Sequence, residues 1–132
     1  MGIFDRAEVS AEPVSPTGES RLSGLDDWNA LVAESETGPV LVFKHSTVCG
    51  ISAHVLADVR DFVRQRGAPR LAVIHVVENR PLSNAISDQT GVRHETPQLI
   101  AIEDGRAVWY ASHWAIDLDD VDRLLGTRGG SR

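Results

Sequence analysis

Two short apolar runs constrain the fold of this chain more than any other feature of its sequence. One covers residues 40–43 and the other covers residues 71–77, where His75 stands among aliphatic side chains. Runs of this length are typical of strands that are buried on both faces of a parallel sheet. Between them, apolar residues recur at helical spacing from Ile51 to Val63. The sequence therefore predicts a β-α-β unit in a sheet that is covered by helices.

Signals on either side of this unit complete the pattern. Apolar residues with helical spacing predict a helix over residues 25–32 before the first strand and another over residues 82–89 after the second. The turn signal Asp104-Gly105 then joins two strands, and a helix over residues 118–125 closes the chain. The resulting order, α-β-α-β-α-β-β-α, is that of the thioredoxin fold. We thus expect an α/β domain with a central mixed four-stranded sheet flanked by helices.

The 132 residues of the chain fit one domain. Residues 1–20 contain prolines and small polar residues, so we expect a flexible N-terminal leader there. The thioredoxin-like domain is expected over residues 21–126, and the glycine-rich residues 127–132 are expected to form a flexible tail. A segment near residues 20–22 could add an edge strand to the sheet.

Charge and composition argue against several classes of function. The net charge of −6 disfavours nucleic acid as a partner, because binding phosphates requires a basic face. No apolar run approaches the ~20 residues that cross a bilayer, and the N-terminus has no apolar signal core. We therefore expect a cytoplasmic protein without a membrane partner. One cysteine and scattered histidines show no metal-ligand spacing, so we also expect no metal site and no bound cofactor.

Cys49 is the only cysteine of the chain, and it stands between the first buried strand and the following helix. The first turn of a helix carries unpaired N–H groups and a partial positive charge, both of which favour a thiolate. Lys44 and His45 lie just upstream and could add positive potential. The alternative is a small buried residue without chemistry, as free cysteines often are, but the strand–loop–helix position favours a reactive thiol.

Two further residues belong to the predicted site. Ser52 occupies the fourth position of Cys-Gly-Ile-Ser, where a dithiol enzyme has its second cysteine. It could offer its hydroxyl to the thiolate, or it could make a local bond to the backbone. Thr96-Pro97 opens the third strand, where proline is tolerated and where a cis bond is accessible. We expect this bond to be cis and Pro97 to lie against Cys49, with the backbone of Thr96 available to a thiol substrate.

The string Phe43-Lys44-His45-Ser46-Thr47-Val48-Cys49-Gly50-Ile51-Ser52 resembles the YtxJ-like family, the monothiol bacilliredoxins. Residues 77–83, 90–98 and 112–114 also match this family. The resemblance implies a thioredoxin fold and thiol exchange with bacillithiol, a low-molecular-weight thiol that would act as co-substrate. The family commonly has proline after the cysteine, where this chain has Gly50. Cys-Gly-Ile-Ser therefore is also similar to the motif of monothiol glutaredoxins, which bridge iron–sulfur clusters.

The topology predicts which other residues share the edge of the sheet with Cys49. Parallel strands end at one edge, and ligands bind beyond it, so Arg80 should lie there, as should His113 and Trp114 after the returning hairpin strand. Arg80 could bind a carboxylate of bacillithiol, or it could be an ordinary surface charge. His113 could donate a proton to the leaving thiolate, or it could hold a structural hydrogen bond. Trp114 is expected to pack against the fold and to form one wall of a substrate-binding groove beside Cys49.

Three functions remain open on the sequence. The leading hypothesis is a monothiol thiol–disulfide oxidoreductase that removes a small thiol, with bacillithiol as the candidate, from protein mixed disulfides through Cys49. Its partners would be those capped proteins and the small thiol. The second is an iron–sulfur cluster carrier similar to monothiol glutaredoxins, and the third is a thioredoxin-fold interaction module in which Cys49 has no catalytic role.

Overall fold

The computed structural model describes residues 19–67 and 69–129, so nearly all of the expected leader and the last three residues lie outside the described residues. The elements follow one another as predicted, with one strand and one short helix added. They are β2 (Ser20–Leu22), α1 (Leu25–Glu34), β3 (Val40–His45), α2 (Gly50–Arg66), β4 (Arg70–His75), α3 (Arg80–Thr90), β5 (Gln98–Glu103), β6 (Arg106–Ser112), a 3-10 helix (His113–Ala115) and α4 (Leu118–Gly129).

The sheet has five strands in the order β2-β4-β3-β5-β6, where four were predicted. The additional strand is β2, which pairs in parallel with β4 from Ser20 to Leu22. It is the edge strand that the segment near residues 20–22 was expected to add. β3 and β4 are parallel, β5 is antiparallel to β3, and β6 is antiparallel to β5. The mixed sheet and the thioredoxin-like α/β class are therefore confirmed.

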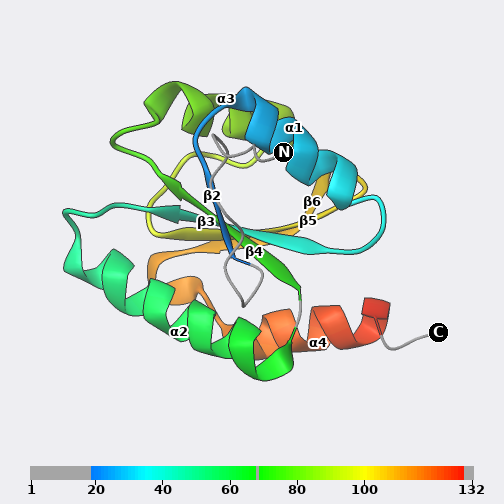
Figure 1. The fold of residues 1–132 in the computed structure, drawn as a ribbon. Coiled ribbons are helices and arrows are strands. Elements are labelled where there is room, and N and C mark those ends of the chain that lie inside the picture. Colours follow the sequence, from blue (N-terminus) through cyan, green and yellow to red (C-terminus); the bar gives the residue numbers. More distant parts are fainter. Residues whose placement is uncertain (1–18, 68, 130–132) are drawn as a thin grey trace, which may run out of the picture.

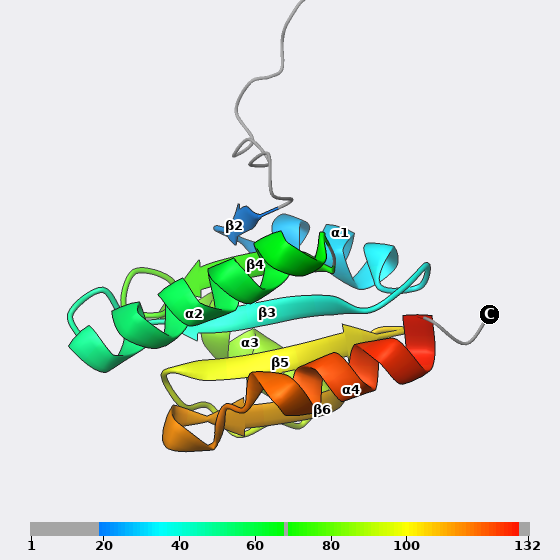
Figure 2. The ribbon, with the colours of Figure 1, turned by 90° about the horizontal axis from the view of Figure 1, so that it is seen from below.

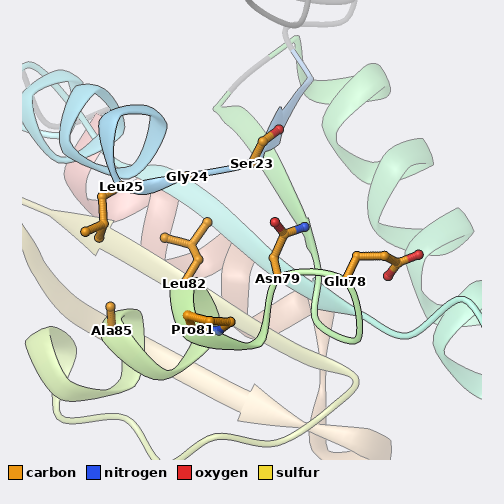
Figure 3. Close-up of a pocket in the computed structure, with 8 residues that line it drawn as sticks. All are labelled: Ser23, Gly24, Leu25, Glu78, Asn79, Pro81, Leu82 and Ala85. Atoms are coloured by element: carbon orange, nitrogen blue, oxygen red, sulfur yellow. The ribbon is translucent and has the colours of Figure 1, made fainter.

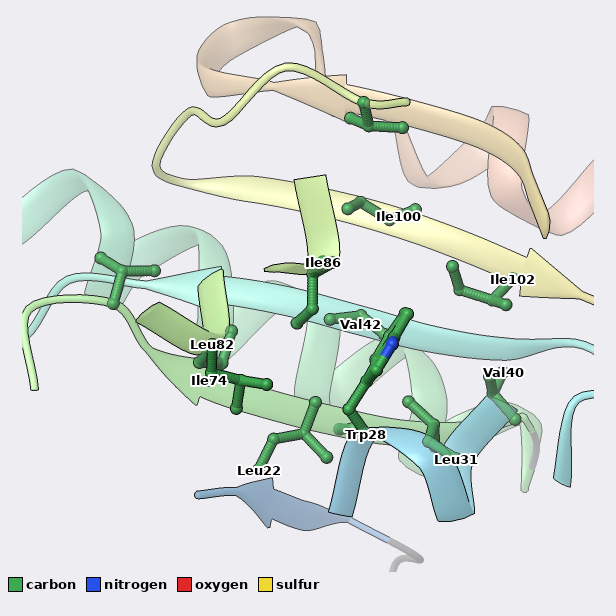
Figure 4. Close-up of a cluster of buried hydrophobic side chains, with 13 residues drawn as sticks. Leu22, Trp28, Leu31, Val40, Val42, Ile74, Leu82, Ile86, Ile100 and Ile102 are labelled. Carbon is green, nitrogen blue, oxygen red and sulfur yellow. The ribbon is translucent and has the colours of Figure 1, made fainter. Parts of the chain in front are cut away.

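Helices cover both faces of this sheet, with α1 and α3 on one face and α2 and α4 on the other (Figures 1 and 2). β3 is buried along its whole length because its side chains alternate between the two layers. Val42 lies in the cluster beneath α1 and α3, around Trp28 and Ile86 (Figure 4), whereas Phe43 lies in the cluster beneath α2 and α4. This double burial explains why the sequence of β3 reads as a continuous apolar run.

The turn between β5 and β6 shows why its two residues are Asp104 and Gly105. Both have a positive φ, 53° and 73°, a conformation that asparagine, aspartate and glycine tolerate best. The N–H of Gly105 donates to Ser35 Oγ at 2.9 Å. A Cβ at Gly105 would lie 3.2 Å from Val32 Cγ1, so the turn also packs closely on α1.

Two features concern the ends and the surface of the domain. α4 continues to Gly129 and so extends beyond residue 126, where we expected the domain to end. Within residues 19–67 and 69–129, no helix is long and apolar enough to cross a membrane.

The connectivity places three helix starts at one edge of the sheet. β2, β3 and β4 are parallel, and each leads directly into a helix, so α1, α2 and α3 all begin at the edge where these strands end. β5 begins at the same edge and β6 ends there, because β5 is antiparallel to β3 and β6 to β5. We call this edge the Cys49 edge, because Cys49 stands between β3 and α2.

Candidate active site at the Cys49 edge

Cys49 is the residue that precedes the first turn of α2, as the sequence predicted. Its backbone is extended, with φ −117° and ψ 117°, and its C=O accepts the N–H of Ala53 at 3.2 Å. Its own N–H donates to Ser46 O at 3.2 Å, which closes a turn after β3. Cys49 is neither fully buried nor fully exposed, and α2 carries no acidic residue in its first turn. A thiol in this position combines access to a substrate with the positive end of a helix.

Ser52 is fully buried beneath this turn and fastens it to β3. Its Oγ accepts the N–H of Ser46 at 3.0 Å and lies 2.8 Å from His45 Nδ1. Since the oxygen already accepts one hydrogen, its own proton can go to Nδ1, which fits a neutral His45 with its hydrogen on Nε2. Ser52 thus makes the local backbone bond that was one of its two expected roles.

Lys44 and His45, the two residues expected to add charge beside the thiol, are both buried. Lys44 has no exposed side-chain surface and points to the α3 layer, where its Nζ donates to Ser83 O at 3.2 Å and Ser87 Oγ at 2.9 Å. Burial lowers the pKa of Lys44 to about 8. His45 is 8% exposed and points to the α2 layer. Both side chains therefore lie beneath the surface of the Cys49 edge and not on it.

His45 belongs to a pair of histidines. The rings of His45 and His75 lie edge to face with their centroids 5.4 Å apart. The pKa of each histidine is below its ordinary value, chiefly because burial disfavours the charged form. At His45 the neighbouring His75 and then Arg60 lower the pKa further. At His75 the charges of Arg21 and Arg60 do so, and Glu78 opposes the shift at both histidines. His75 is half-buried at the end of β4.

The Thr96-Pro97 peptide bond is cis, as predicted. Pro97 is buried, and its C=O accepts the N–H of His113 at 2.9 Å. The next residue, Gln98, pairs with Lys44 across β5 and β3. The sheet register therefore brings the start of β5, and the 3-10 helix after β6, to the Cys49 edge.

His113 and Trp114 lie at this edge but are exposed. The packing role expected of Trp114 is wrong, because 76% of its surface is accessible. The short 3-10 helix turns its side chain outward, a feature that no sequence period announces. Val48 and Ile51, which flank the Cys49 turn, are also exposed, as is Val77 after β4. The Cys49 edge therefore presents several apolar side chains to solvent.

Arg80 is the first residue of α3 and is exposed at the same edge. A pocket of about 320 Å³ lies beside it, between the starts of α1 and α3 (Figure 3). Its lining residues are Ser23, Gly24, Leu25, Glu78, Asn79, Pro81, Leu82 and Ala85. Cys49 and Arg80 are not among them, so this pocket is not formed by the thiol turn.

Sequence reasoning missed three residues that shape this edge: Ser83, His94 and Gln98. His94 Nδ1 lies 2.9 Å from Ser83 Oγ and 3.4 Å from Lys44 Nζ, and Gln98 Nε2 donates to Arg93 O at 2.8 Å. One signal was available. A lysine that directly follows the apolar run of β3, and so stands in a strand expected to be buried, must find polar partners. The sequence does not say which residues they are.

In the part of the chain that the structure describes, no group of three or more histidine, cysteine, aspartate or glutamate residues is placed to hold a metal ion. At Gly50, where the bacilliredoxins commonly have proline, an added Cβ would meet no atom within 4 Å. Packing therefore does not require glycine at this position.

Comparison with solved structures supports the fold. A structure described as having a thioredoxin fold and an oxidoreductase role matches with a TM-score of 0.73 and 29% identity, over 80% of this chain and 92% of that chain. A single-residue variant of thioredoxin from Halobacterium salinarum NRC-1 matches with a TM-score of 0.67 and 24% identity, over 88% and 95%. Thioredoxin from Fasciola hepatica matches with a TM-score of 0.65 and 17% identity, over 82% and 97%.

The family model of the monothiol bacilliredoxin BrxC matches residues 20–121, a range that contains the Cys49 turn, Arg80, the cis Pro97 and the 3-10 helix. Family and fold together identify a thiol–disulfide oxidoreductase whose co-substrate is a low-molecular-weight thiol. The match favours this function over the cluster carrier that the string Cys-Gly-Ile-Ser had left open. The chain therefore belongs to the monothiol bacilliredoxin family.

Proposed function

We propose that this protein removes bacillithiol from protein mixed disulfides, with Cys49 as its nucleophile in a Cys-x-x-Ser active site. The observation that carries this proposal is the position of the only cysteine, partly exposed at the start of α2, with a buried serine where a dithiol enzyme has its second cysteine. Ser52 cannot form a disulfide, so Cys49 must exchange with thiols outside the chain. The proposed setting is the cytoplasm, where such thiols are abundant.

Two exchange steps complete the proposed cycle. The Cys49 thiolate attacks the bacillithiol sulfur of the capped protein, a disulfide forms between Cys49 and bacillithiol, and the thiolate of the client protein leaves and takes up a proton. A second bacillithiol thiolate then attacks the capped Cys49. This step releases the Cys49 thiolate and one molecule of bacillithiol disulfide, so electrons and atoms balance.

The remaining residues of the Cys49 edge are assigned binding roles in this proposal. The backbone of Thr96, next to Pro97, would pair with the chain or cap that flanks the attacked disulfide. His113 would supply a proton to the leaving thiolate, and Trp114 would wall the groove. The exposure of His113 and Trp114 supports these roles, because both side chains remain available to a ligand. Arg80 would bind a carboxylate of bacillithiol.

The decisive experiment follows the mass of the intact protein after exposure to bacillithiol disulfide and, separately, to glutathione disulfide. We expect one bacillithiol adduct, faster formation than with glutathione, and no adduct on Cys49→Ser. Release of bacillithiol from a capped model protein should require Cys49 and survive in Ser52→Ala at a reduced rate. Faster reaction with glutathione would contradict the choice of small thiol, and activity of Cys49→Ser would contradict the mechanism.

A further inference from the structure

The arginines of this protein divide into paired and unpaired ones. Five of them form ion pairs with carboxylates, namely Arg60, Arg64, Arg66, Arg70 and Arg123. Among the described residues, no carboxylate pairs with Arg80 or Arg93. Both lie close in sequence to residues that contact the buried Lys44, since Arg80 precedes Ser83 on α3 and Arg93 adjoins His94. Lys44, Arg80 and Arg93 therefore bring positive charge to one region of a protein whose net charge is −6.

His94 lies against α3 one turn after Arg80. Ser83 lies one turn after Arg80 on α3, and its Oγ is 2.9 Å from His94 Nδ1. Residues three apart on a helix share a face, so the start of α3 presents Arg80 next to the His94 ring. In agreement, the positive charge of Arg80 is one of the causes that lower the pKa of His94.

Lys44 fixes the orientation and the tautomer of His94. Its Nζ lies 3.4 Å from His94 Nδ1, and an ammonium group can only donate, so Nδ1 acts as the acceptor. A neutral His94 then carries its hydrogen on Nε2, which is left to donate to a group outside the cluster. Burial and the charges of Lys44 and Arg80 keep the pKa of His94 low, and Glu95 is the acidic group that opposes them. The site thus holds positive charge and a spare donor.

We propose that Arg80 and His94 form a carboxylate-binding subsite at the Cys49 edge. Only the origin of the bound carboxylate rests on the proposed function. It comes either from the acidic part of the small thiol or from an acidic side chain of the client protein. The helix starts agree with an anion here, since α2 and α3 have no acidic residue in their first turns, whereas α1 and α4 each have two.

Binding at this subsite is linked to a proton. A carboxylate beside Arg80 offsets the positive charge that Lys44 and Arg80 impose on His94, so the pKa of His94 rises when the ligand binds. Affinity for a carboxylate therefore increases as the pH falls from neutral, where His94 begins to gain its proton.

The first test is an NMR titration of His94 in the wild-type protein, with and without sodium malate. We expect malate to shift the His94 signal and to raise its pKa. Arg80→Gln should abolish both effects. His94→Gln keeps a donor and an acceptor but cannot titrate, so it should bind malate with little dependence on pH. Arg106→Gln, at the opposite end of the sheet, is the matched control and should behave as wild type. An unchanged His94 pKa in malate would overturn the subsite.

The second test separates the two sources of the carboxylate. One model protein is capped either with bacillithiol, which carries carboxylates, or with cysteamine, which carries none. If the subsite binds the cap, Arg80→Gln should raise KM about threefold to fivefold for the bacillithiol cap alone, as expected for one exposed charge pair, with kcat nearly unchanged. If Arg80→Gln raises KM for both caps, the bound carboxylate belongs to the client protein. If it raises KM for neither cap, the subsite is refuted.

The two proposals fail in different ways. If Arg80→Gln and His94→Gln de-cap as fast as the wild-type protein and with the same KM, the subsite is refuted, but exchange at Cys49 is not. Absence of de-capping by the wild-type protein would refute the proposed function, whereas the malate titration would still decide the subsite.

Discussion

His45 Nδ1 and Ser52 Oγ lie 2.8 Å apart beneath the turn that carries Cys49. The same Oγ accepts the N–H of Ser46, so one buried hydroxyl joins the end of β3, the turn and the first helical turn of α2. The serine that replaces a second cysteine is therefore a structural part of the thiol turn. It holds Cys49 at the start of the helix without offering a second sulfur.

The first prediction follows from this bond. Ser52→Ala leaves the Ser46 N–H and the His45 ring without their partner, and a buried unpaired polar group costs about 1–3 kcal/mol. We expect the free energy of unfolding in urea to fall by that amount and Cys49 to alkylate at an altered rate. Ser23→Ala, an exposed serine after β2, is the control and should change neither quantity. Equal stability of the two variants would contradict the role given to Ser52.

The second prediction concerns alkaline pH and Lys44. Its pKa is about 8 in the folded protein and 10.5 ordinarily, so between these values the unfolded chain binds a proton that the folded one does not. Stability must therefore rise with pH across this window, by about 3 kcal/mol at ~1.4 kcal/mol for each pKa unit. Urea unfolding from pH 7.5 to 10.5 measures the rise. Lys44→Met cannot titrate at this position, so its stability should not show this rise. An equal rise in both proteins would contradict the assignment of the rise to Lys44.

The third prediction concerns acid pH. The pKa values of His45, His75 and His94 lie below 6.5 in the folded protein, chiefly because of burial. As the pH falls through 6.5 the unfolded chain takes up protons before the folded one, so stability should decrease. We expect a lower free energy of unfolding at pH 5.5 than at pH 7.5, and a smaller loss in His45→Asn. A loss in His45→Asn as large as that of the wild type would contradict the role of the buried His45.

The fourth prediction concerns the residue after the cysteine. Gly50 is the first residue of α2, a position that favours proline, and a side chain there meets no atom within 4 Å. The extended backbone of Cys49, at φ −117° and ψ 117°, is close to what a residue before proline requires. Gly50→Pro should therefore fold and gain about 0.4–1 kcal/mol, because proline restricts the unfolded chain. Thermal unfolding measures this gain in stability. Gly50→Ala is the control, because it shows how much of the gain comes from removing glycine and how much needs the proline ring.

Local signals in the sequence determined the framework of this protein. The apolar runs that became β3 and β4 are buried on both faces, so their composition alone identifies them. The Asp104-Gly105 turn and the position of Cys49 before α2 were also readable, because positive φ values and helix starts depend on a few adjacent residues. Cis Pro97 followed from its place in that order of elements.

Tertiary structure alone decided the remaining features. Lys44 reads in the sequence as a charge beside the thiol, yet its partners Ser87 and His94 lie 43 and 50 residues away and meet it only when α3 packs on β3. The sequence offered residues 20–22 as an edge strand, and their pairing with β4 decides that they form one. Trp114 is exposed because the chain turns after β6. For Lys44 the outcome depends on which distant groups share its buried surroundings. Burial sets the energy of a charge or a hydrogen bond more strongly than the neighbours in sequence do.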